Sequence, residues 1–454
     1  MRVNSLGDFA TAIPGIPGMR TQSADAISDF SLPHRAWRLL PAKFRRRLLG
    51  EVTAFLAPRP GAAVAAPGSP RNVTVVGLLS SLTGLGEGAR LSLAALCEAH
   101  VPARYVDLSR AFDCRDLASW PDCGASPSFA PGDEGAAIVH INAPLIPLAY
   151  MRLPRCLVRR SRIVGYWAWE LPIVPRNWRN AFAFVHEIWV PSRFVADALA
   201  RETDLPIRVV AHPVAANGSA VQAADRRQFD LADDGLLVLS AFNAASGFER
   251  KNPLAAIEAF GRAFGASMRH RLLIKTINPH HQPRAMARLR DKAAGMPNVT
   301  IIERACGPNE MRSLIAASDI VLSLHRSEGF GLVAAEAMLA GKPVVATGWS
   351  GNMDFMDADN SRPVEFDLVP ARDPDGIYDL AGARWADPDT AHAARCLQEL
   401  ASSRTLRDAL GTRAKSEARD RFGADRFAQA ARATFSLRAP VDSSGKTHIV
   451  TETR

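Results

Sequence analysis

The stretch "HRSEGFGLVAAEAMLAGKPVVATGWSGN", residues 325–352, decides the fold. It contains a glycine-rich turn, an apolar helical run that begins near Leu332, and the strand-like segment "KPVVAT". The strand-like segment "DIVLSLH" precedes the turn, so the order is strand, turn, helix, strand. This alternation is typical of a doubly wound parallel sheet, in which ligands bind at the carboxyl ends of the strands.

The same alternation extends from Asn72 to about residue 436, interrupted by the polar segment "AANGSAVQAADRRQFDLADDG". Before this break we expect strands at "VTVVGLL", "ARYVDL", "AAIVHIN", "SRIVGYWAW", "EIWVPS" and "IRVVAHPV". After it we expect strands at "LLVLSAFN", "HRLLIKTI", "VTIIE", "DIVLSLH" and "KPVVAT", and helices near 253–266, 283–295, 308–317, 331–341 and within 389–436.

We therefore predict an α/β protein with two Rossmann-like domains that face each other across a ligand-binding cleft. The predicted segments are an irregular basic leader and linker (1–70), an N-terminal domain (71–225), a C-terminal domain (226–436) and a disordered tail (437–454). A length of 454 residues suits two domains better than one core.

Composition narrows the class of protein. No apolar run reaches the roughly 18 residues that span a bilayer, and the N-terminus lacks a secretory signal, so a cytoplasmic protein is expected. The six cysteines have no zinc-like spacing and are interpreted as reduced structural thiols. A net charge of +9 favours a polyanionic neighbour, which could be nucleic acid, a phosphorylated ligand or an anionic membrane. No nucleic-acid-binding motif accompanies the charge, so nucleic acid is the least favoured.

Two basic segments could meet a membrane. In "PHRAWRLLPAKFRRRLLG", residues 33–50, apolar side chains recur at helical spacing among arginines, which suits a helix on an anionic bilayer or one packed on the protein's own surface. Pro41 would interrupt either helix. The run "YMRLPRCLVRRSR", residues 150–162, suits an anionic bilayer, a polyprenyl-diphosphate sugar or an exposed solvated face.

The turn at residues 325–331 carries Glu328, and Glu336 follows in the helix. Backbone amides at a glycine-rich helix start suit a phosphate, whereas carboxylates suit hydroxyl groups. A nucleotide sugar has both a diphosphate and hydroxyls, so it fits this stretch. Alternatively, Glu328 caps the helix and Glu336 is a solvated helical residue.

The segment "SGFERKNPLAAIEAF" places Arg250 and Lys251 between a strand and a helix. At the carboxyl end of its strand, this pair would face the same cleft as Glu328. Two fixed cations can hold a diphosphate and stabilise the charge that develops as it leaves. Alone, basic residues before a helix are usually solvated, but together with the glycine turn the pattern is more specific.

At this point the sequence resembles the retaining glycosyltransferases of family 4, which have the GT-B fold. The resemblance covers about residues 72–436 and rests on "GLGEGAR" (84–90), "GYWAWELP" (165–172), "EIWVPS" (187–192), "ERKNP" (249–253), "SEGFGLVAAEAM" (327–338) and "GKPVVATGWSGNMDFM" (341–356). The motifs of the C-terminal half are the more specific.

The resemblance implies a role for each matching residue. Glu328 and Glu336 match the two glutamates of the family's E-x7-E motif, which hold a donor-sugar hydroxyl and the ribose hydroxyls. Arg250 and Lys251 match the basic pair that binds the donor diphosphate. The other implied donor-binding residues are Gly331 and Leu332 through their amides, Gly84 and Gly86 in the N-domain glycine loop, and, more loosely, Cys306 near the base.

The sequence departs from the family where many members carry a donor-contacting histidine after an N-domain strand. The strand here reads "RIVGYWAWELP", so Glu170 or His140 could take that role, and Trp167 and Trp169 could stack on a sugar. Alternatively, His140 is a core residue and the tryptophans serve packing.

The family's reaction is transfer with retention, in which the departing phosphate oxygen takes the acceptor's proton on the same face. No side-chain nucleophile, metal or cofactor is then expected, and "DAD" at 357–359 is interpreted as turn residues. We predict transfer of a hexose, mannose from GDP-mannose or glucose from UDP-glucose, to a glycan acceptor. The acceptor would be lipid-linked, through polyprenyl diphosphate, in surface polysaccharide synthesis on the inner face of the membrane. The alternatives are a GT-B sugar-nucleotide epimerase and a non-catalytic nucleotide-sugar-binding partner subunit.

Overall fold

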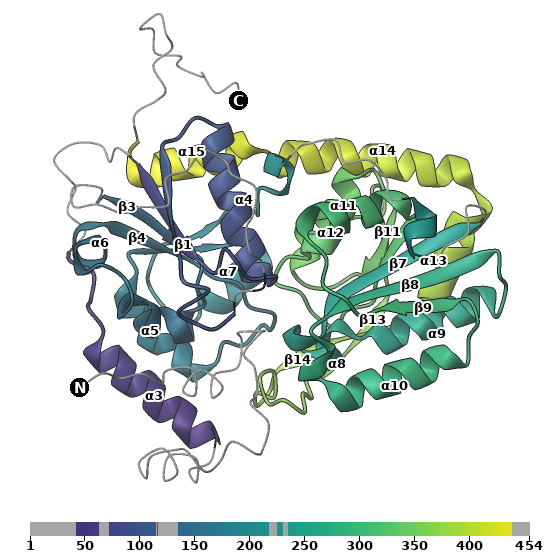
Figure 1. The fold of residues 1–454 in the computed structure, drawn as a ribbon, viewed down its shortest axis with the longest axis horizontal. Helices are drawn as coiled ribbons and strands as arrows, with labels where there is room; N and C mark the ends of the chain where they lie inside the picture. The colour runs from purple at the N-terminus through teal and green to yellow at the C-terminus, as the bar shows by residue number, and fades with distance from the viewer. Residues whose placement is uncertain are drawn as a thin grey trace, which may run out of the picture.

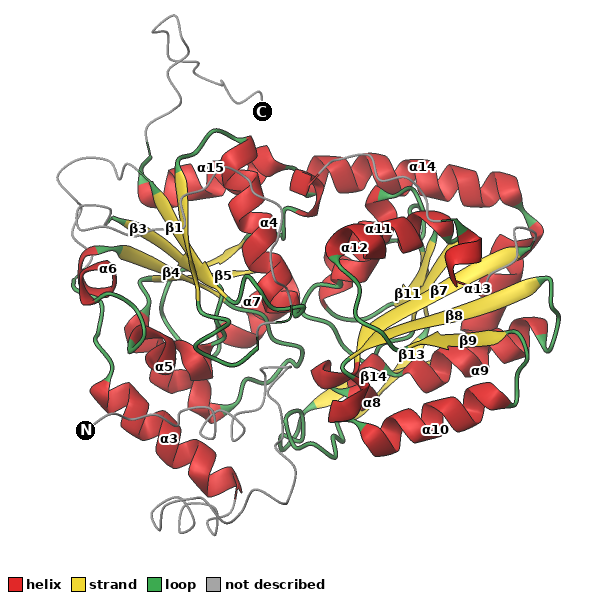
Figure 2. Ribbon diagram, in the orientation of Figure 1, coloured by secondary structure: helices red, strands yellow, loops and turns green. Residues whose placement is uncertain are grey.

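The chain forms two α/β halves that lie side by side, with the last helices running along both (Figure 1). The structure is a computed structural model, and it describes residues 42–62, 72–114, 116, 135–217, 225–229 and 235–437. Each half contains a six-stranded parallel sheet with helices around it (Figure 2). The predicted α/β class with two Rossmann-like domains is therefore confirmed.

The sheet of the N-terminal half has the strand order β2-β1-β3-β4-β5-β6. Because β1 pairs with β2 on one side and with β3 on the other, the strand order reverses between β1 and β3. The loops after β1, β3 and β4 leave from the carboxyl ends of the strands. The strands are β1 (Val73–Gly77), β2 (Ala103–Asp107), β3 (Ala136–Val139), β4 (Arg162–Tyr166), β5 (Glu187–Val190) and β6 (Ile207–Val209).

The sheet of the C-terminal half has the order β12-β11-β10-β7-β8-β9. Its order reverses between the paired strands β7 and β10, so their carboxyl ends form the switch point where such sheets bind ligands. The strands are β7 (Leu236–Asn243), β8 (His270–Ile277), β9 (Val299–Ile302), β10 (Ile320–Ser323), β11 (Val344–Thr347) and β12 (Arg362–Val364). An antiparallel hairpin of β13 (Phe366–Pro370) and β14 (Arg384–Pro388) follows.

The helices α9, α10 and α11 match the sequence pattern closely, because proline at the first position and amphipathic spacing mark them clearly. In the N-terminal half they are α4 (Gly84–Glu98), α5 (Ile146–Tyr150), α6 (Arg155–Arg160) and α7 (Arg193–Leu199), with the 3-10 segment η3 (Arg176–Phe184). The C-terminal half has α8 (Phe248–Lys251), α9 (Pro253–Phe264), α10 (Pro283–Ala294), α11 (Pro308–Ala317), α12 (Leu332–Leu339), α13 (Thr390–Ser402), α14 (Arg404–Arg421) and α15 (Ala424–Phe435).

The last helix returns to the first half. Whereas α14 packs on α12, α15 packs on α4 (Figure 1). The fully buried Trp189 of β5 meets Phe427 and Phe435 of α15, with ring centroids 5.6 and 6.3 Å apart. The helix α15 therefore completes the core of the N-terminal half, although its residues fall within the predicted C-terminal segment 226–436. The predicted segment boundaries themselves stay predictions.

The loop between β13 and β14 makes a second connection between the halves. Its residues Ala371, Tyr378 and Ala383 are buried in the same apolar cluster as Trp169 and Trp178 of the N-terminal half. Side chains of the C-terminal half thus pack against the segment that follows β4 in the N-terminal half.

The basic leader contains a helix, α3 (Ala42–Leu56), which packs against α5 and η3. Its last turns expose large apolar side chains: Phe55 is 85% exposed and Leu56 is 60% exposed. The rest of the predicted basic helix, residues 33–41, and the predicted tail from residue 438 onward lie outside the described residues. No helix among the described residues is long and apolar enough to cross a membrane.

Candidate functional site

A cavity of about 370 Å³ lies between the two halves, at the carboxyl ends of β1, β3 and β4 on one side and of β7, β8 and β10 on the other. Both strand-order switch points therefore face it. Ten of the residues predicted from the sequence line this cavity: Gly84, Trp169, Glu170, Arg250, Lys251, Cys306, Glu328, Gly331, Leu332 and Glu336.

The segment "ERKNP" owes its shape to its last two residues. Asn252 is in the left-handed conformation (φ +51°), which ends the one-turn helix α8, and Pro253 begins α9. The Asn252 side chain donates to the Leu324 carbonyl oxygen at 3.0 Å, which ties the segment to the end of β10. Arg250 and Lys251 are thereby fixed on a rigid turn at the switch point.

The turn that carries Glu328 is held from both sides. Gly331 has φ +99°, a conformation that a side chain would strain, and it begins α12. A Cβ atom on Gly329 would lie 2.9 Å from the Trp169 carbonyl oxygen, so glycine allows the two halves to meet here. The Ser350 hydroxyl accepts from the Glu328 amide at 2.8 Å, which connects "GWSGN" to the turn.

Glu328 pairs with both predicted cations. Its carboxylate lies 3.1 Å from Nη1 of Arg250 and forms an ion pair with Lys251. Burial alone would raise the pKa of Glu328, but Lys251 and Arg250 outweigh that effect and hold it at about 2. Arg250 is 2% exposed and donates to the carbonyl oxygens of Ser327 and Ser246, both at 2.8 Å. The result is an ionised carboxylate beside two fixed cations.

Glu336 lies about two helical turns further on and faces a carboxylate of the other half. Burial raises its pKa to about 8, and Glu87 of α4 contributes to that shift. Both Glu87 and Glu336 line the cavity. The two carboxyl groups can exchange hydrogen bonds with a ligand that has neighbouring hydroxyl groups, although Glu87 also pairs with Arg90 of its own helix.

Glu170 reaches the site from the loop after β4. Its carboxylate accepts from the Tyr378 hydroxyl at 3.1 Å and lies 3.9 Å from Nη2 of Arg250. Burial raises the pKa of Glu170, while Arg250 opposes the shift. The Trp169 indole donates to the Ile173 carbonyl oxygen at 2.8 Å, and its ring packs on Tyr378, so one face of this tryptophan is already used.

The loop that carries Cys306 is shaped by a buried lysine. Lys275 lies at the carboxyl end of β8, and its ammonium donates to the carbonyl oxygens of Thr276 (3.1 Å) and Arg304. Lys275 and Cys306 both line the cavity. A lysine is unusual within an apolar run such as "RLLIKTI", so this pattern is a signal that could have marked Lys275 as a candidate cavity residue.

Three predicted contacts take other positions. His140 is fully buried, stacks on Tyr166 with centroids 4.5 Å apart, and is not among the residues that line the cavity, because the Tyr166 ring covers it. Gly86 lies in the first turn of α4, where its amide donates to the hydroxyl of the N-cap residue Thr83 at 3.1 Å, and it does not line the cavity. Trp167 is fully buried and serves packing.

Many of the residues that line the cavity were not predicted from the sequence, and His212 and Tyr378 are two of them. His212, which follows β6 in the segment "AHPV", lines the cavity and contacts Phe330 with ring centroids 5.2 Å apart. Burial lowers the pKa of His212 to about 3. Tyr378 comes from the β13–β14 loop, in a segment without any recognisable motif.

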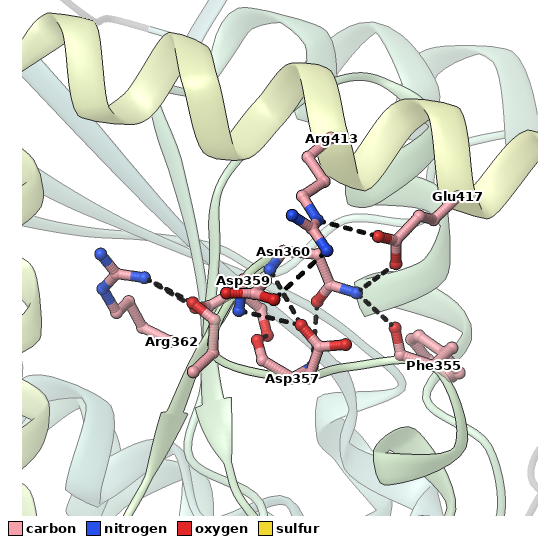
Figure 3. A network of polar contacts seen from close by, with 9 residues as sticks. Phe355, Asp357, Asp359, Asn360, Arg362, Arg413 and Glu417 are labelled. Carbon is pink, nitrogen blue, oxygen red and sulfur yellow. Dashed lines mark hydrogen bonds and ion pairs between the residues drawn. The ribbon is translucent and has the colours of Figure 1, made fainter.

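The "DAD" segment lies in a turn, as interpreted from the sequence (Figure 3). The Asp357 carboxylate accepts from the amides of Asp359 and Asn360, and Asp359 pairs with Arg413 of α14 at 3.2 Å. The Asn360 side chain donates to Glu417, also on α14, at 2.7 Å. These contacts hold α14 against the rest of the C-terminal half. Within the described ranges, no group of three or more His, Cys, Asp or Glu residues could hold a metal ion.

Comparison with known proteins places this geometry in context. Residues 201–420 match the family model described as "Family 4 Glycosyltransferase in conflict systems". Among solved structures, a glycosyltransferase from Rickettsia africae ESF-5 has a TM-score of 0.56 and 12% identity, over 81% of this chain and 98% of that chain. Anabaena HepE, solved in complex with UDP-glucose, has a TM-score of 0.56 and 14% identity, over 80% and 99%.

A third structure, WaaG, described as a glycosyltransferase involved in lipopolysaccharide biosynthesis, has a TM-score of 0.51 and 16% identity, over 80% of this chain and 99% of that chain. A search of curated proteins gives no match. The structural likenesses confirm the predicted GT-B fold, and the family model confirms the resemblance to family 4.

Proposed function

We propose that this chain, a glycosyltransferase of the family 4 type with the GT-B fold, moves a hexose from a nucleotide-diphosphate sugar to a glycan acceptor with retention of configuration. The observation that carries the proposal is the contact of Glu328 with Arg250 and Lys251 at the joint ends of β7 and β10. This site offers cations for a diphosphate and a carboxylate for a sugar, a few ångströms apart.

In the proposed reaction, Arg250 and Lys251 stabilise the charge that develops on the departing diphosphate. Glu328 accepts a hydrogen bond from a donor-sugar hydroxyl and favours positive charge at the anomeric carbon. Glu336 accepts from the ribose, and the amides of Gly331 and Leu332 meet the phosphates. The departing phosphate oxygen takes the acceptor's proton on the same face, so neither a metal nor another cofactor is part of the proposal.

Two donors remain in the proposal, glucose from UDP-glucose and mannose from GDP-mannose. HepE was solved with UDP-glucose, which supports the first donor. The motifs of this sequence, taken together, slightly favour mannose. The base would lie near Lys275 and Cys306, which both line the cavity.

A thermal-shift panel of UDP, GDP, ADP and their common hexose conjugates tests the donor. A ligand that binds only the native state raises the melting temperature, so one base should give a selective shift, enlarged by its hexose. Absence of any shift would remove the main support for the transferase proposal. Binding of a nucleotide without turnover with any acceptor would favour the non-catalytic subunit. Release of a free epimerised sugar nucleotide without an acceptor would favour the epimerase.

The acceptor is proposed to be lipid-linked, through polyprenyl diphosphate, and the reaction to take place in the cytoplasm at the inner face of the membrane, in surface polysaccharide synthesis. Exposed arginines on and before α6 support this part of the proposal, as do the exposed apolar side chains of α3, which packs on the neighbouring α5. An apolar patch flanked by basic residues suits an anionic bilayer. The basic side chains are Arg152, Arg155, Arg159 and Arg160.

The double substitution Phe55→Ser and Leu56→Ser tests the membrane contact. Because insertion of these side chains would supply much of the binding free energy, we expect about tenfold weaker affinity for phosphatidylglycerol vesicles, measured by co-sedimentation. Met268→Ser, which removes an exposed apolar side chain in the other half, is the control and should bind as the wild type does. Sedimentation of the double variant at the wild-type level would contradict the proposal.

A further inference from the structure

Tyr378 belongs to the C-terminal half, but its surroundings belong largely to the other half. It lies in the loop between β13 and β14, is 5% exposed, and packs on Trp169 with ring centroids 5.5 Å apart. The Arg250 guanidinium lies over its ring, 5.4 Å from the centroid. The tyrosine is therefore held on one side by the N-terminal half and on the other by the proposed diphosphate-binding arginine.

The hydroxyl of Tyr378 has a specific partner, Glu170. The charged groups that face Glu170 come from two other elements: Arg250 and Lys251 on α8, and Glu328 on the turn after β10. Glu328 lies closer to Arg250 than Glu170 does, at 3.1 against 3.9 Å, and Glu328 also holds Lys251. Glu170 is thus the more weakly compensated of the two carboxylates, and the Tyr378 hydroxyl, at 3.1 Å, is its nearest donor.

A bound diphosphate makes this donor more important. Under the proposed function, the phosphates engage Arg250 and Lys251, so these cations have less to offer to Glu170. The Tyr378 hydroxyl cannot be diverted in the same way, because its ring is fixed between Trp169 and Arg250.

We propose that Tyr378 is a positioning residue, whose hydroxyl keeps the Glu170 carboxylate ionised and oriented into the cavity, where Glu170 accepts a hydrogen bond from the donor sugar. The proposal rests on the proposed function. It means that a residue of the C-terminal half, Tyr378, orients a sugar-binding residue of the N-terminal half, Glu170.

The electrostatics of the site support it and give the sign of the pH effect. Burial raises the pKa of Glu170, and the negative charge of Glu328 raises it further. The charges of Arg250 and Lys251 lower this pKa, and so does the hydrogen bond from Tyr378. Loss of the hydroxyl therefore raises the pKa of Glu170. Sugar binding that needs the ionised carboxylate is present above the pKa of Glu170 and is lost as the pH falls through it. Without the Tyr378 hydroxyl, sugar binding is therefore lost at a higher pH.

Tyr378→Phe tests the proposal, because it keeps the ring packing and removes only the hydroxyl. Calorimetric titration with UDP, UDP-glucose, GDP and GDP-mannose from about pH 5 to about pH 9 gives the affinity that the hexose adds to the nucleotide. In the wild type this gain should fall on acidification, and in the variant the midpoint should rise by about one pH unit.

Tyr150→Phe is the matched control. The Tyr150 hydroxyl is also buried and donates to a carbonyl oxygen, that of Phe184 at 2.8 Å, but Tyr150 does not line the cavity. This variant should lose stability without any shift of the midpoint. Glu170→Gln should make the gain from the hexose smaller and independent of pH.

The outcomes separate the two proposals. If Tyr378→Phe has the wild-type midpoint, or if the wild-type gain from the hexose does not depend on pH, the role of Tyr378 is refuted while the proposed function stands. If the wild type binds none of the four nucleotides, the proposed function fails and the role of Tyr378 fails with it.

Discussion

Replacement of Arg250 with alanine should reduce kcat/KM for sugar transfer by about 1,000-fold, the largest effect expected for any single residue of the site. Arg250 meets the proposed diphosphate and also holds the turn after β10 through the Ser327 carbonyl oxygen. Its loss removes a charge that stabilises the leaving group and leaves the Glu328 and Glu170 carboxylates less compensated. Because that site is buried, the free energy of unfolding should also fall by about 3 kcal/mol.

Initial rates and urea unfolding curves measure the two effects of Arg250→Ala separately. Arg290→Ala is the control, since Arg290 is exposed and pairs with Glu303 on the surface. Arg250→Lys should restore part of the stability but little of the activity, because a lysine cannot reach Ser246, Ser327 and Glu328 together. Activity of Arg250→Ala near that of the wild type would remove Arg250 from the site.

Glu328→Gln should separate transfer from nucleotide binding. Transfer should fall by about 100-fold, because the amide cannot favour positive charge at the anomeric carbon. Affinity for the nucleoside diphosphate should be retained or increased, because Glu328 no longer competes with the phosphates for Arg250 and Lys251. Turnover assays and calorimetric titration with the nucleotide identified by the thermal-shift panel measure the two quantities.

Glu303→Gln is the control for this variant, since Glu303 makes only a surface pair of comparable charge. A parallel loss of nucleotide affinity and transfer in Glu328→Gln would mean that this carboxylate organises the cation pair and does not serve the sugar. Unchanged transfer would contradict its proposed role altogether.

Most of the fold could be predicted from the sequence because buried parallel strands form continuous apolar runs with clear ends. The run "HRLLIKTI" coincides with β8, and "LLVLSAFN" coincides with β7. The position of α15 could not be predicted in this way. An amphipathic helix shows that one face is buried, but not which half of the molecule covers it.

The same limit applies to the site. Arg250, Lys251 and Glu328 were predicted because each lies in a connection that follows a strand at the switch point, where sequence order determines position. His140 also follows a strand, but its ring turns under Tyr166, and only the packing of that tyrosine determines this. Tyr378 depends on how a hairpin loop crosses to the other half, which no local pattern encodes.

The return of α15 to the N-terminal half has a consequence for the order in which the chain folds. As the chain leaves the ribosome, β5 and α4 appear early, but the helix that covers Trp189 appears only after the whole C-terminal half. Until then α4 covers its part of this face of the first sheet, but the part around Trp189 lacks its cover. The half that is made first is thus completed last.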